Sequence, residues 1–491
     1  MAGKIRFAPV TAAPTIARES SSVGRDVLLA IGLLLTTATQ FRLPGSPFGP
    51  GEVFLVGWIA LMLIFDLGGY TPLTSAFRRL LTFWALFALA QSVGTLTGMM
   101  IGDQHDPSLF IHDVLAYPLV AALSCLSVIE PGAARRLRRC AEISTGLGAV
   151  CLVPQLMIGW DLISLPILEP WFGDRLRGWS NNPNQLAFLC AVLVLVSLHL
   201  ADTADRASKR SIALLCMIPP ILVGRLTKTD TFTFALLGAV PIYLVAKLRF
   251  WLGASERRAS LRTVLAWVAV IGVPLLLVSA VPFALSSSGN SDQLAMGLMK
   301  GGGKEASAEA DLRLALWREA IERGVQSYML GLGPGPHLPI PPEIIAARMT
   351  EPDLDTGDHP ALNATPNFEA HNSPLDLFTQ GGLLADVSFV WLLAMACIVP
   401  YRARLAGLVA LLAGVAIFGL TNNIVRPPMF WFAVALCLVS DGRADGVQVG
   451  RRPPWVTHRV RWPDHTPTRS FDAGRPGDVG VAREPNNALP K

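Results

Sequence analysis

Long apolar runs constrain this chain more than any other feature of its sequence. Runs of about 18 to 22 apolar residues recur between residues 26 and 440, and an α-helix of that length crosses the hydrocarbon core of a bilayer. Hydrophobic residues make up 52% of the chain and charged residues only 16%. A transmembrane β-barrel would instead show short strands of alternating hydrophobicity. The sequence therefore predicts an all-α polytopic membrane protein.

The polar segments divide the chain into three parts. Residues 1–25 precede the first run, residues 26–440 form one transmembrane domain, and residues 441–491 form a tail rich in Arg, Pro and Gly that we predict to be disordered. One long polar connection, 286–373, separates the ninth run from the tenth. We predict twelve spans, over residues 26–43, 52–67, 80–101, 109–129, 140–159, 185–200, 211–224, 231–247, 263–285, 374–399, 405–421 and 428–440.

The placement of arginine and lysine predicts the orientation of these spans. If the N-terminus is cytoplasmic, the cytoplasmic connections hold 20 Arg and Lys residues, whereas the short outer connections hold only six. Cytoplasmic loops of membrane proteins carry such an excess. We therefore expect residues 1–25 and 441–491 in the cytoplasm and the loop 286–373 on the outer face.

The sequence predicts neither a cofactor nor a metal site. The seven cysteines all lie in or at the end of an apolar run, which does not suggest a disulfide framework. The histidines of the large loop, His337, His359 and His371, lack the spacing of zinc ligands. No nucleotide-binding motif is present, so we expect the energy for any reaction to come with the substrate. We predict no nucleic-acid partner.

Several cations lie in connections that we expect on the outer face, where cations should be scarce. Guanidinium groups match the oxygens of phosphate, so a phosphate-bearing lipid is the simplest explanation. The alternative is an aromatic belt with arginines that reach for the lipid headgroups. The candidate diphosphate-binding residues are Arg175, Arg177, Arg225, Lys228 and Arg313.

Two further residues are candidates to support these cations. Asn184 ends an amide-rich turn that follows Arg177. Asp230 follows Lys228 closely and can orient Arg225 or Lys228, or can itself act as a base. Both positions precede an apolar run, so we expect the scaffold to hold them at the outer membrane surface.

The large loop contains a second set of candidates. Leu314, Trp317, Ile321 and Val325 recur at helical spacing and predict an amphipathic helix that lies at the membrane surface or on the helix bundle. Trp317 on this helix is a supporting candidate for the site. Residues 336–368 are rich in Pro, Asp and Asn and predict an irregular flap.

His371 is the candidate catalytic base. It lies directly before an apolar run, where the scaffold can position it, and histidine is the usual base near neutral pH. Its neighbour Asn372 is a supporting candidate. The alternative for His371 is a helix-capping or interfacial histidine. We predict His337 and His359, in the flap, to be ordinary surface residues.

These residues resemble the signature of a known family, the O-antigen ligase and O-antigen polymerase superfamily. The segment Arg177-Gly178-x-x-Asn181-Asn182-Pro183-Asn184-Gln185 is similar to its earlier outer motif. The later motifs are Arg313-x-x-x-Trp317, Gly331-x-Gly333-x-Gly335, and His371-Asn372-x-x-Leu375-Asp376 with Gly381-Gly382. One departure is Thr229-Asp230, where the family often has Ser-Arg, so Arg225 or Lys228 would have to supply that cation.

The resemblance implies a fold and an activity. The fold is that of a C-type glycosyltransferase in the bacterial inner membrane, with a large periplasmic loop between helices 9 and 10. The enzyme would be metal-independent and would use undecaprenyl-diphosphate-linked glycans. The histidine that matches His371 would activate the acceptor, and outer-face arginines would bind the diphosphate.

Three functions remain open from the sequence. The leading one is a polymerase that joins lipid-linked oligosaccharide repeats into exopolysaccharide or O-antigen. The alternative is a ligase that passes the glycan to another acceptor, such as lipid A core. A glycan or lipid transporter is a more distant alternative, because it predicts charges spread through the spans. The expected partners are the lipid-linked glycan, a glycan or lipid acceptor, membrane lipids and other polysaccharide-export proteins.

Overall fold

The computed structural model describes the greater part of the predicted transmembrane domain. The described residues are 15–42, 48–66, 73–103, 107–130, 132–163, 168–254, 303–339 and 368–441. The predicted span 263–285, the remainder of the loop with His359, and the predicted tail lie outside the described residues.

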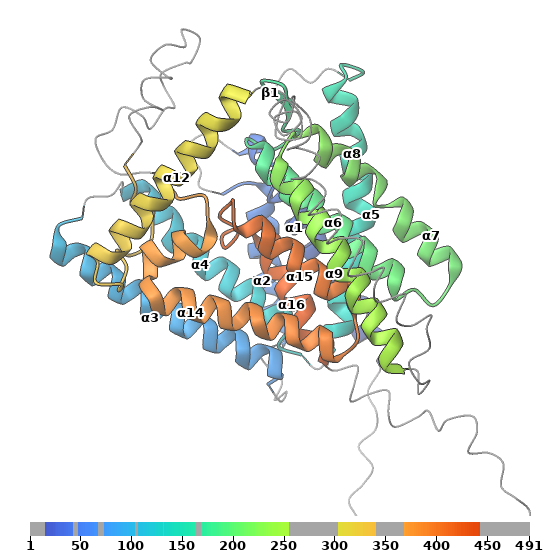
Figure 1. Ribbon diagram of the computed structural model, residues 1–491. Helices are drawn as coiled ribbons and strands as arrows, with labels where there is room; N and C mark the ends of the chain where they lie inside the picture. Colours follow the sequence, from blue (N-terminus) through green and yellow to red (C-terminus); the bar gives the residue numbers. More distant parts are fainter. Residues whose placement is uncertain are drawn as a thin grey trace, which may run out of the picture. The chain divides into compact units, whose positions relative to one another are not determined.

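Helices make up most of the described chain (Figure 1). The other regular elements are a two-residue pair of antiparallel strands, β1 (Trp171–Phe172) and β2 (Arg175–Leu176), and short 3-10 helices. The helices are α1 (Thr15–Leu35), α2 (Pro50–Asp66), α3 (Ser75–Ile101), α4 (Pro107–Ser127), α5 (Ala133–Gly159), α6 (Pro183–Asp202), α7 (Ala207–Leu215), α8 (Ile218–Leu226), α9 (Asp230–Ala254), α12 (Gly303–Gln326), α14 (Ser373–Arg402), α15 (Ala406–Gly419) and α16 (Pro428–Leu438).

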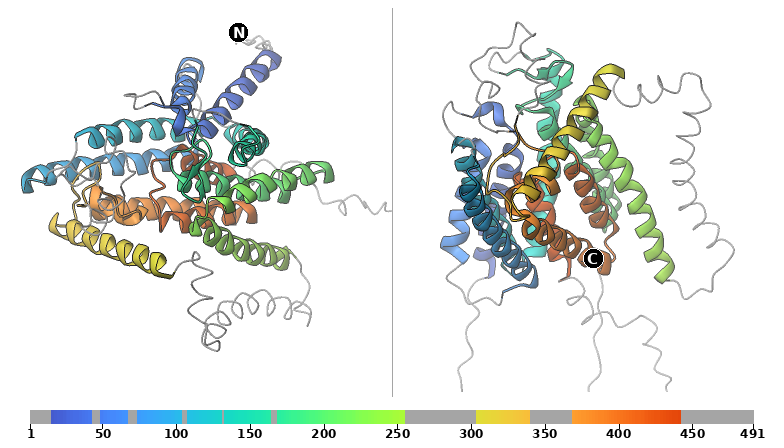
Figure 2. Two further views of the ribbon diagram at one scale, coloured as in Figure 1. Left: turned by 90° about the horizontal axis from the view of Figure 1, so that it is seen from above. Right: turned by 60° about the vertical axis from the view of Figure 1, so that its left-hand side comes forward.

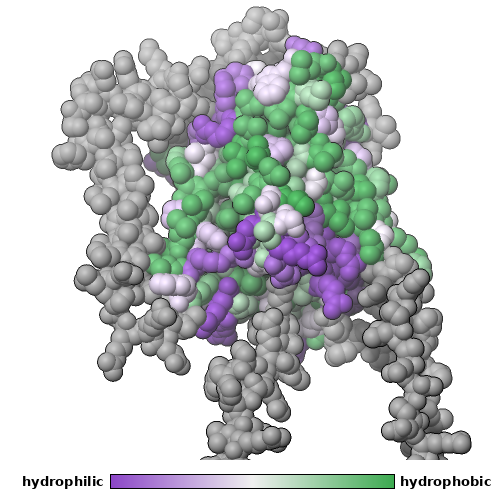
Figure 3. Space-filling model, turned by 90° about the vertical axis from the view of Figure 1, so that its right-hand side faces the viewer, coloured by the Kyte–Doolittle hydropathy of each residue, from purple (hydrophilic) through white to green (hydrophobic). Residues whose placement is uncertain are grey.

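Seven helical segments among the described residues are long and apolar enough to cross a membrane. They are α3, the part of α4 from Phe110, α5, α6, the α7–α8 pair, α9 and α14, and α2, α15 and α16 are shorter apolar helices. Apolar side chains cover much of the described surface in Figure 3, and hydrophilic ones gather below them and at the upper edge. The prediction of a helical, membrane-embedded protein is confirmed at this level.

Two of the predicted site residues lie where the sequence starts a helix. The side chain of Asn182 accepts a hydrogen bond from the backbone N–H of Asn184, and Pro183 occupies the first turn of α6. Asn372 caps α14 in the same way, and Pro374 lies in its first turn. An amide cap satisfies an orphan N–H, and proline fits the first turn because it has no N–H to lose. Asn184 and Asn372 are thus fixed by local chemistry.

The most buried helices are apolar on all sides. α6, α15 and α16 lie in the interior of the helix arrangement (Figures 1 and 2), and buried residues occur all around α6 and α16. A helix that is hydrophobic all round must be covered by other helices. Trp431 of α16 packs against Trp84 of α3 with ring centroids 4.4 Å apart, and the indole N–H of Trp84 donates to Ser124.

Connections that we predicted on the same side of the membrane contact one another. At one end, Arg138 donates to Thr203 at 2.8 Å, and Lys247 forms an ion pair with Asp202. At the other end, the hydroxyls of Thr231 and Thr421 are 2.6 Å apart. The described helices therefore run between two polar ends.

A break in α14 shapes the second of these ends. Gly382 has φ 62° and ψ −161°, which interrupts the helix. The break leaves backbone carbonyls without helical partners, and the glycine-rich loop after α12 supplies donors to them. The N–H of Leu332 donates to the carbonyl of Thr379, and the N–H of Gly333 donates to that of Gln380, both at 2.8 Å.

Glycines make this contact possible because backbones approach too closely for a side chain. A Cβ atom on Gly331 or on Gly94 of α3 would lie 2.4 Å from the carbonyl oxygen of Gln380. One on Gly382 would lie 2.1 Å from the carbonyl oxygen of Met329. The glycine motif of the sequence is therefore a joint between helices. We call it the glycine lock, which consists of Gly94, Gly331, Gly333 and Gly382.

Candidate functional site

A cavity of about 200 Å³ lies beside the glycine lock, at the end of the fold that contains Thr421 and Asn372. Segments far apart in the sequence form it: the first turns of α4, the loop after α12, the chain that leads into α14, and the turn between α15 and α16. Its lining residues are His112, Asp113, Pro336, Phe368, Glu369, His371 and Arg426. The candidate base His371 is therefore one wall of a cavity.

The backbone on both sides of His371 is held by one buried carboxylate. Asp376 accepts hydrogen bonds from the backbone N–H of Ala370, at 2.8 Å, and from that of Asn372, at 3.2 Å. His371 itself has a left-handed backbone with φ 50°, which is uncommon for a residue other than glycine. A carboxylate that bonds the N–H groups before and after this residue stabilises that conformation. The side chain of His371 is exposed, and its ring packs edge-on against the ring of Phe368.

Two predicted supporting residues hold the same segment. The indole N–H of Trp317 donates to the carbonyl of Ala370 at 3.1 Å, which ties α12 to the cavity. The side-chain amide of Asn372 donates to the carbonyl of Leu420 at 2.9 Å, which ties the start of α14 to the end of α15. Both residues therefore act on the backbone next to His371.

Arg426 is held in the cavity wall between two carboxylates. Its guanidinium donates to Asp113 at 2.5 Å and forms an ion pair with Glu369. Burial alone would lower the pKa of Arg426, but the negative charges of Glu369 and Asp113 outweigh it and raise the pKa well above its ordinary value. The Nε atom of Arg426 is buried and has no hydrogen-bond partner among the described residues.

Arg175, a predicted diphosphate ligand, connects three elements. Its guanidinium donates to the carbonyl of Thr227 at 3.1 Å, to the side-chain oxygen of Asn184 at 2.8 Å and to the hydroxyl of Thr229 at 3.0 Å. These contacts fasten the β1–β2 hairpin to the start of α6 and to the α8–α9 turn. Arg175 and Asn184 are both predicted site residues. The structure brings them together, and their contact holds these elements in place.

The other predicted cations lie outside the cavity lining. Arg177 pairs with Glu169 and lies over the ring of Phe172. Lys228 donates to Asp174 at 2.5 Å, and this hydrogen bond lowers the pKa of Asp174. The candidate Arg313 is half-buried on α12.

The α8–α9 turn presents two exposed cations, Arg225 and Lys228. Arg225 donates to the hydroxyl of Thr233 at 2.6 Å. Asp230 is the first residue of α9, where a negative charge is favourable beside the N-terminus of a helix. The next residue, Thr231, contacts Thr421, so this turn is joined to the turn that carries Arg426.

The prediction that His337 is an ordinary surface residue is wrong. Its ring is buried, with Nδ1 2.8 Å from a carboxylate oxygen of Asp103 and Nε2 2.8 Å from the carbonyl oxygen of Gly333. Arg323 of α12 also pairs with Asp103 at 3.6 Å. His337 therefore holds the glycine lock to the end of α3. Most of the predicted irregular flap 336–368, namely residues 340–367, lies outside the described part.

Sequence reasoning missed four contributors to the site. His112 and Asp113 begin what looks like an ordinary apolar run, and Arg426 is one outer cation among several. Asp376 is part of the resemblance motif but carries no local sign of its role. One signal was present: a charged pair such as His112-Asp113 next to a span seldom occurs without a partner. Its partner is Arg426, 313 residues later.

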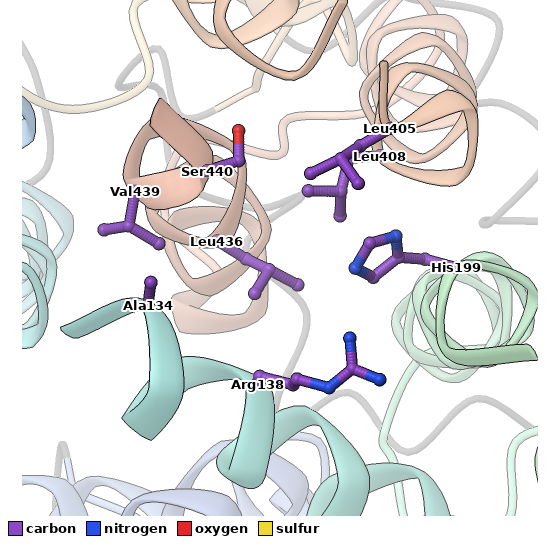
Figure 4. A pocket seen from close by; sticks show the side chains of 8 residues that line it. All are labelled: Ala134, Arg138, His199, Leu405, Leu408, Leu436, Val439 and Ser440. Atoms are coloured by element: carbon purple, nitrogen blue, oxygen red, sulfur yellow. The ribbon is translucent and has the colours of Figure 1, made fainter. Parts of the chain in front are cut away.

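A second cavity at the other end of the fold is much smaller. Figure 4 shows His199 of α6 and Arg138 of α5 on either side of it, with Leu405, Leu408 and Leu436 along its walls. Its volume is about 20 Å³, which is room for about one water molecule. It is too small for a substrate.

Comparison with known proteins assigns no family to this chain. No family model matches it, and no curated protein is significantly similar to it. Within the described ranges, no three His, Cys, Asp or Glu side chains are grouped closely enough to hold a metal ion. The site must therefore be interpreted from its own geometry.

Proposed function

We propose that this protein is an inner-membrane glycosyltransferase that polymerises undecaprenyl-diphosphate-linked oligosaccharide repeats on the periplasmic face. The cavity is its catalytic site, and we expect the loop 286–373, between two of twelve predicted spans, on that face. The observation that carries the proposal is the meeting of His371, Glu369 and Arg426 around one cavity. The ring of His371 can accept a proton, and a carboxylate beside it can bind sugar hydroxyls.

The charges of the cavity favour a sugar over a diphosphate at this position. Arg426 contributes one positive formal charge, and Glu369 and Asp113 contribute two negative ones. A diphosphate would be repelled by the excess of negative charge. Sugar hydroxyls instead donate to carboxylates, and Glu369 lines the cavity. Phe368 adds an apolar face for the sugar ring.

The diphosphate of the donor then belongs at the α8–α9 turn. Arg225 and Lys228 are exposed there, and the contact between Thr231 and Thr421 joins this turn to the cavity. A donor that lies across both would place its first sugar carbon at the cavity and its leaving group on the cations. Binding two reactants in fixed geometry can supply much of the rate enhancement.

In the transfer step, His371 acts as the base. Its neutral ring accepts the proton of the acceptor hydroxyl as that oxygen forms a bond to the first carbon of the donor glycan. The bond from this carbon to the diphosphate breaks, and undecaprenyl diphosphate leaves with the electron pair. The energy is already stored in the donor, so no nucleotide is consumed.

We expect replacement of Arg225 by alanine to weaken donor use. The loss of a charge-assisted contact costs about 1.5–3 kcal/mol, which is about 10- to 150-fold in rate or donor affinity. Lysine at this position should restore activity only in part, because it lacks the planar fork. Transfer assays on membranes with equal protein content measure this. Arg206→Ala, an exposed arginine at the opposite end, is the control. Equal activity of Arg225→Ala and Arg206→Ala would remove Arg225 from the donor site.

A ligase for lipid A core is the alternative, because it needs the same donor and an acceptor hydroxyl. The products that accumulate in a strain without this protein distinguish a polymerase from a ligase. A strain that lacks it should accumulate single repeat units on the carrier lipid, seen by mass spectrometry of the lipid extract. Long glycan on the carrier lipid would instead identify a ligase. Complementation with Arg206→Ala should restore the polymer.

A further inference from the structure

The helix α12 has two apolar sides, and the protein covers only one of them. Leu316 and Ala320 are buried and pack on Leu338 and Ala370. Of the four residues predicted to form its apolar face, Trp317 is partly buried against this cluster, whereas Leu314, Ile321 and Val325 are 58%, 49% and 52% exposed. Spacings of seven and four residues place these three on one face of the helix. We call them the outer face of α12.

Exposed apolar side chains continue from this face onto a membrane-spanning helix. Tyr328 and Met329, just after α12, are exposed, and so are Leu383 and Val387 of α14. The N–H of Leu383 donates to the carbonyl of Met329 at 2.9 Å, so the two segments lie against each other. Because α14 is long and apolar enough to cross a membrane, its exposed leucines and valines contact lipid. The same lipid is therefore adjacent to the outer face of α12.

In Figure 1 α12 crosses the direction of α9, which has the length and composition of a span. Arg318, four residues after Leu314, lies on the outer face and is exposed, and its long side chain can reach the lipid headgroups. The side between this face and the buried one is charged, and there Arg323 pairs with Glu319 at 3.1 Å. An exposed apolar face bordered by charged side chains is typical of helices that lie in the membrane interface.

We propose that α12 lies in the plane of the membrane, with its outer face inserted among the lipids of one leaflet. The partner of this surface is lipid rather than a second protein, because the exposed apolar surface of α14 continues it. The inference rests on membrane embedding and not on the proposed reaction. It has a consequence for the cavity, because Trp317 of the same helix bonds the carbonyl of Ala370 next to His371. Insertion of α12 fixes the cavity at the depth of the headgroups.

Fluorescence quenching in liposomes tests this inference. The full chain, with its own cysteines replaced by alanine, carries one new cysteine labelled with an environment-sensitive dye. Val325→Cys reports on the outer face, and Gln326→Cys, the next residue, exposed and about 100° further around the helix, is its matched control. We expect lipids with a spin label near the headgroup to quench the dye at position 325 several-fold more than iodide does. At position 326, iodide should be the stronger quencher.

Two results would overturn the inference. If iodide quenches the dye equally at both positions, the outer face is in water. If neither quencher reaches position 325, another protein chain covers the outer face. Ile321→Cys serves as a second reporter on the same face if the Val325 variant does not fold, as judged by size-exclusion chromatography.

Discussion

Replacement of His371 by alanine is expected to lower glycan transfer by at least about 100-fold, because general base catalysis typically contributes 10²–10⁴-fold. The protein should remain folded, since the ring of His371 is exposed and the backbone around it is held by Asp376. Glutamine should not restore activity, because an amide is not an effective base. Transfer rates in membranes that contain equal amounts of each variant measure the effect.

The second histidine of the cavity provides the comparison. His112 lines the same space and lies 3.3 Å from Asp113, so His112→Ala changes the volume of the cavity in a similar way. We expect a smaller loss from this variant. Near-normal turnover by His371→Gln would mean that the ring of His371 serves only as a hydrogen-bonding group. The base would then be Glu369, which faces the same cavity, or Asp230.

Replacement of Gly382 by alanine is expected to prevent assembly of the folded protein. A Cβ atom there would lie 2.1 Å from the carbonyl oxygen of Met329, and the backbone conformation is one that essentially only glycine adopts. The strain, together with the loss of the hydrogen bonds that Thr379 and Gln380 accept, costs roughly 3–5 kcal/mol. That is a large part of the stability of a typical protein.

The measurement is the yield and thermal stability of detergent-extracted protein by size-exclusion chromatography. Gly146→Ala is the matched control, because Gly146 is in α5 and a Cβ atom there would meet open space. Alanine in a helix interior is favoured over glycine by about 0.5–1 kcal/mol, so the control should be as stable as the original chain or more so. A Gly382→Ala protein with unchanged melting temperature would mean that the glycine lock adds nothing to stability.

The helices could be predicted because their signals are local. Apolar runs and caps such as Asn182 and Asn372 depend only on neighbouring residues, so predicted spans and described helices overlap throughout the described chain. The joint between the glycine motif and the break in α14 could not be predicted in this way. Gly331 and Gln380 are far apart in sequence, and neither residue indicates that their backbones touch.

The candidate site was predictable only in part, for a similar reason. His371 was identified by its place before a span, and it does line a cavity. Arg426 and Arg175 both lie in connections that we predicted on the outer face, yet one arginine lines the cavity and the other fastens a hairpin. Only the long-range contacts distinguish them. The prediction for His337 was wrong because its polar, proline-rich context suggests an exposed side chain. In the structure its ring is buried and paired with Asp103.

The most direct test of the central claim is transfer by the purified protein alone. The full chain is reconstituted in liposomes with undecaprenyl-diphosphate-linked repeat units and without nucleotide, and the glycan length and the free lipid diphosphate are measured over time. The account predicts longer glycans and release of one lipid diphosphate for each new linkage, both abolished in His371→Ala. The absence of any lengthening by folded protein, or equal lengthening by His371→Ala, would contradict it.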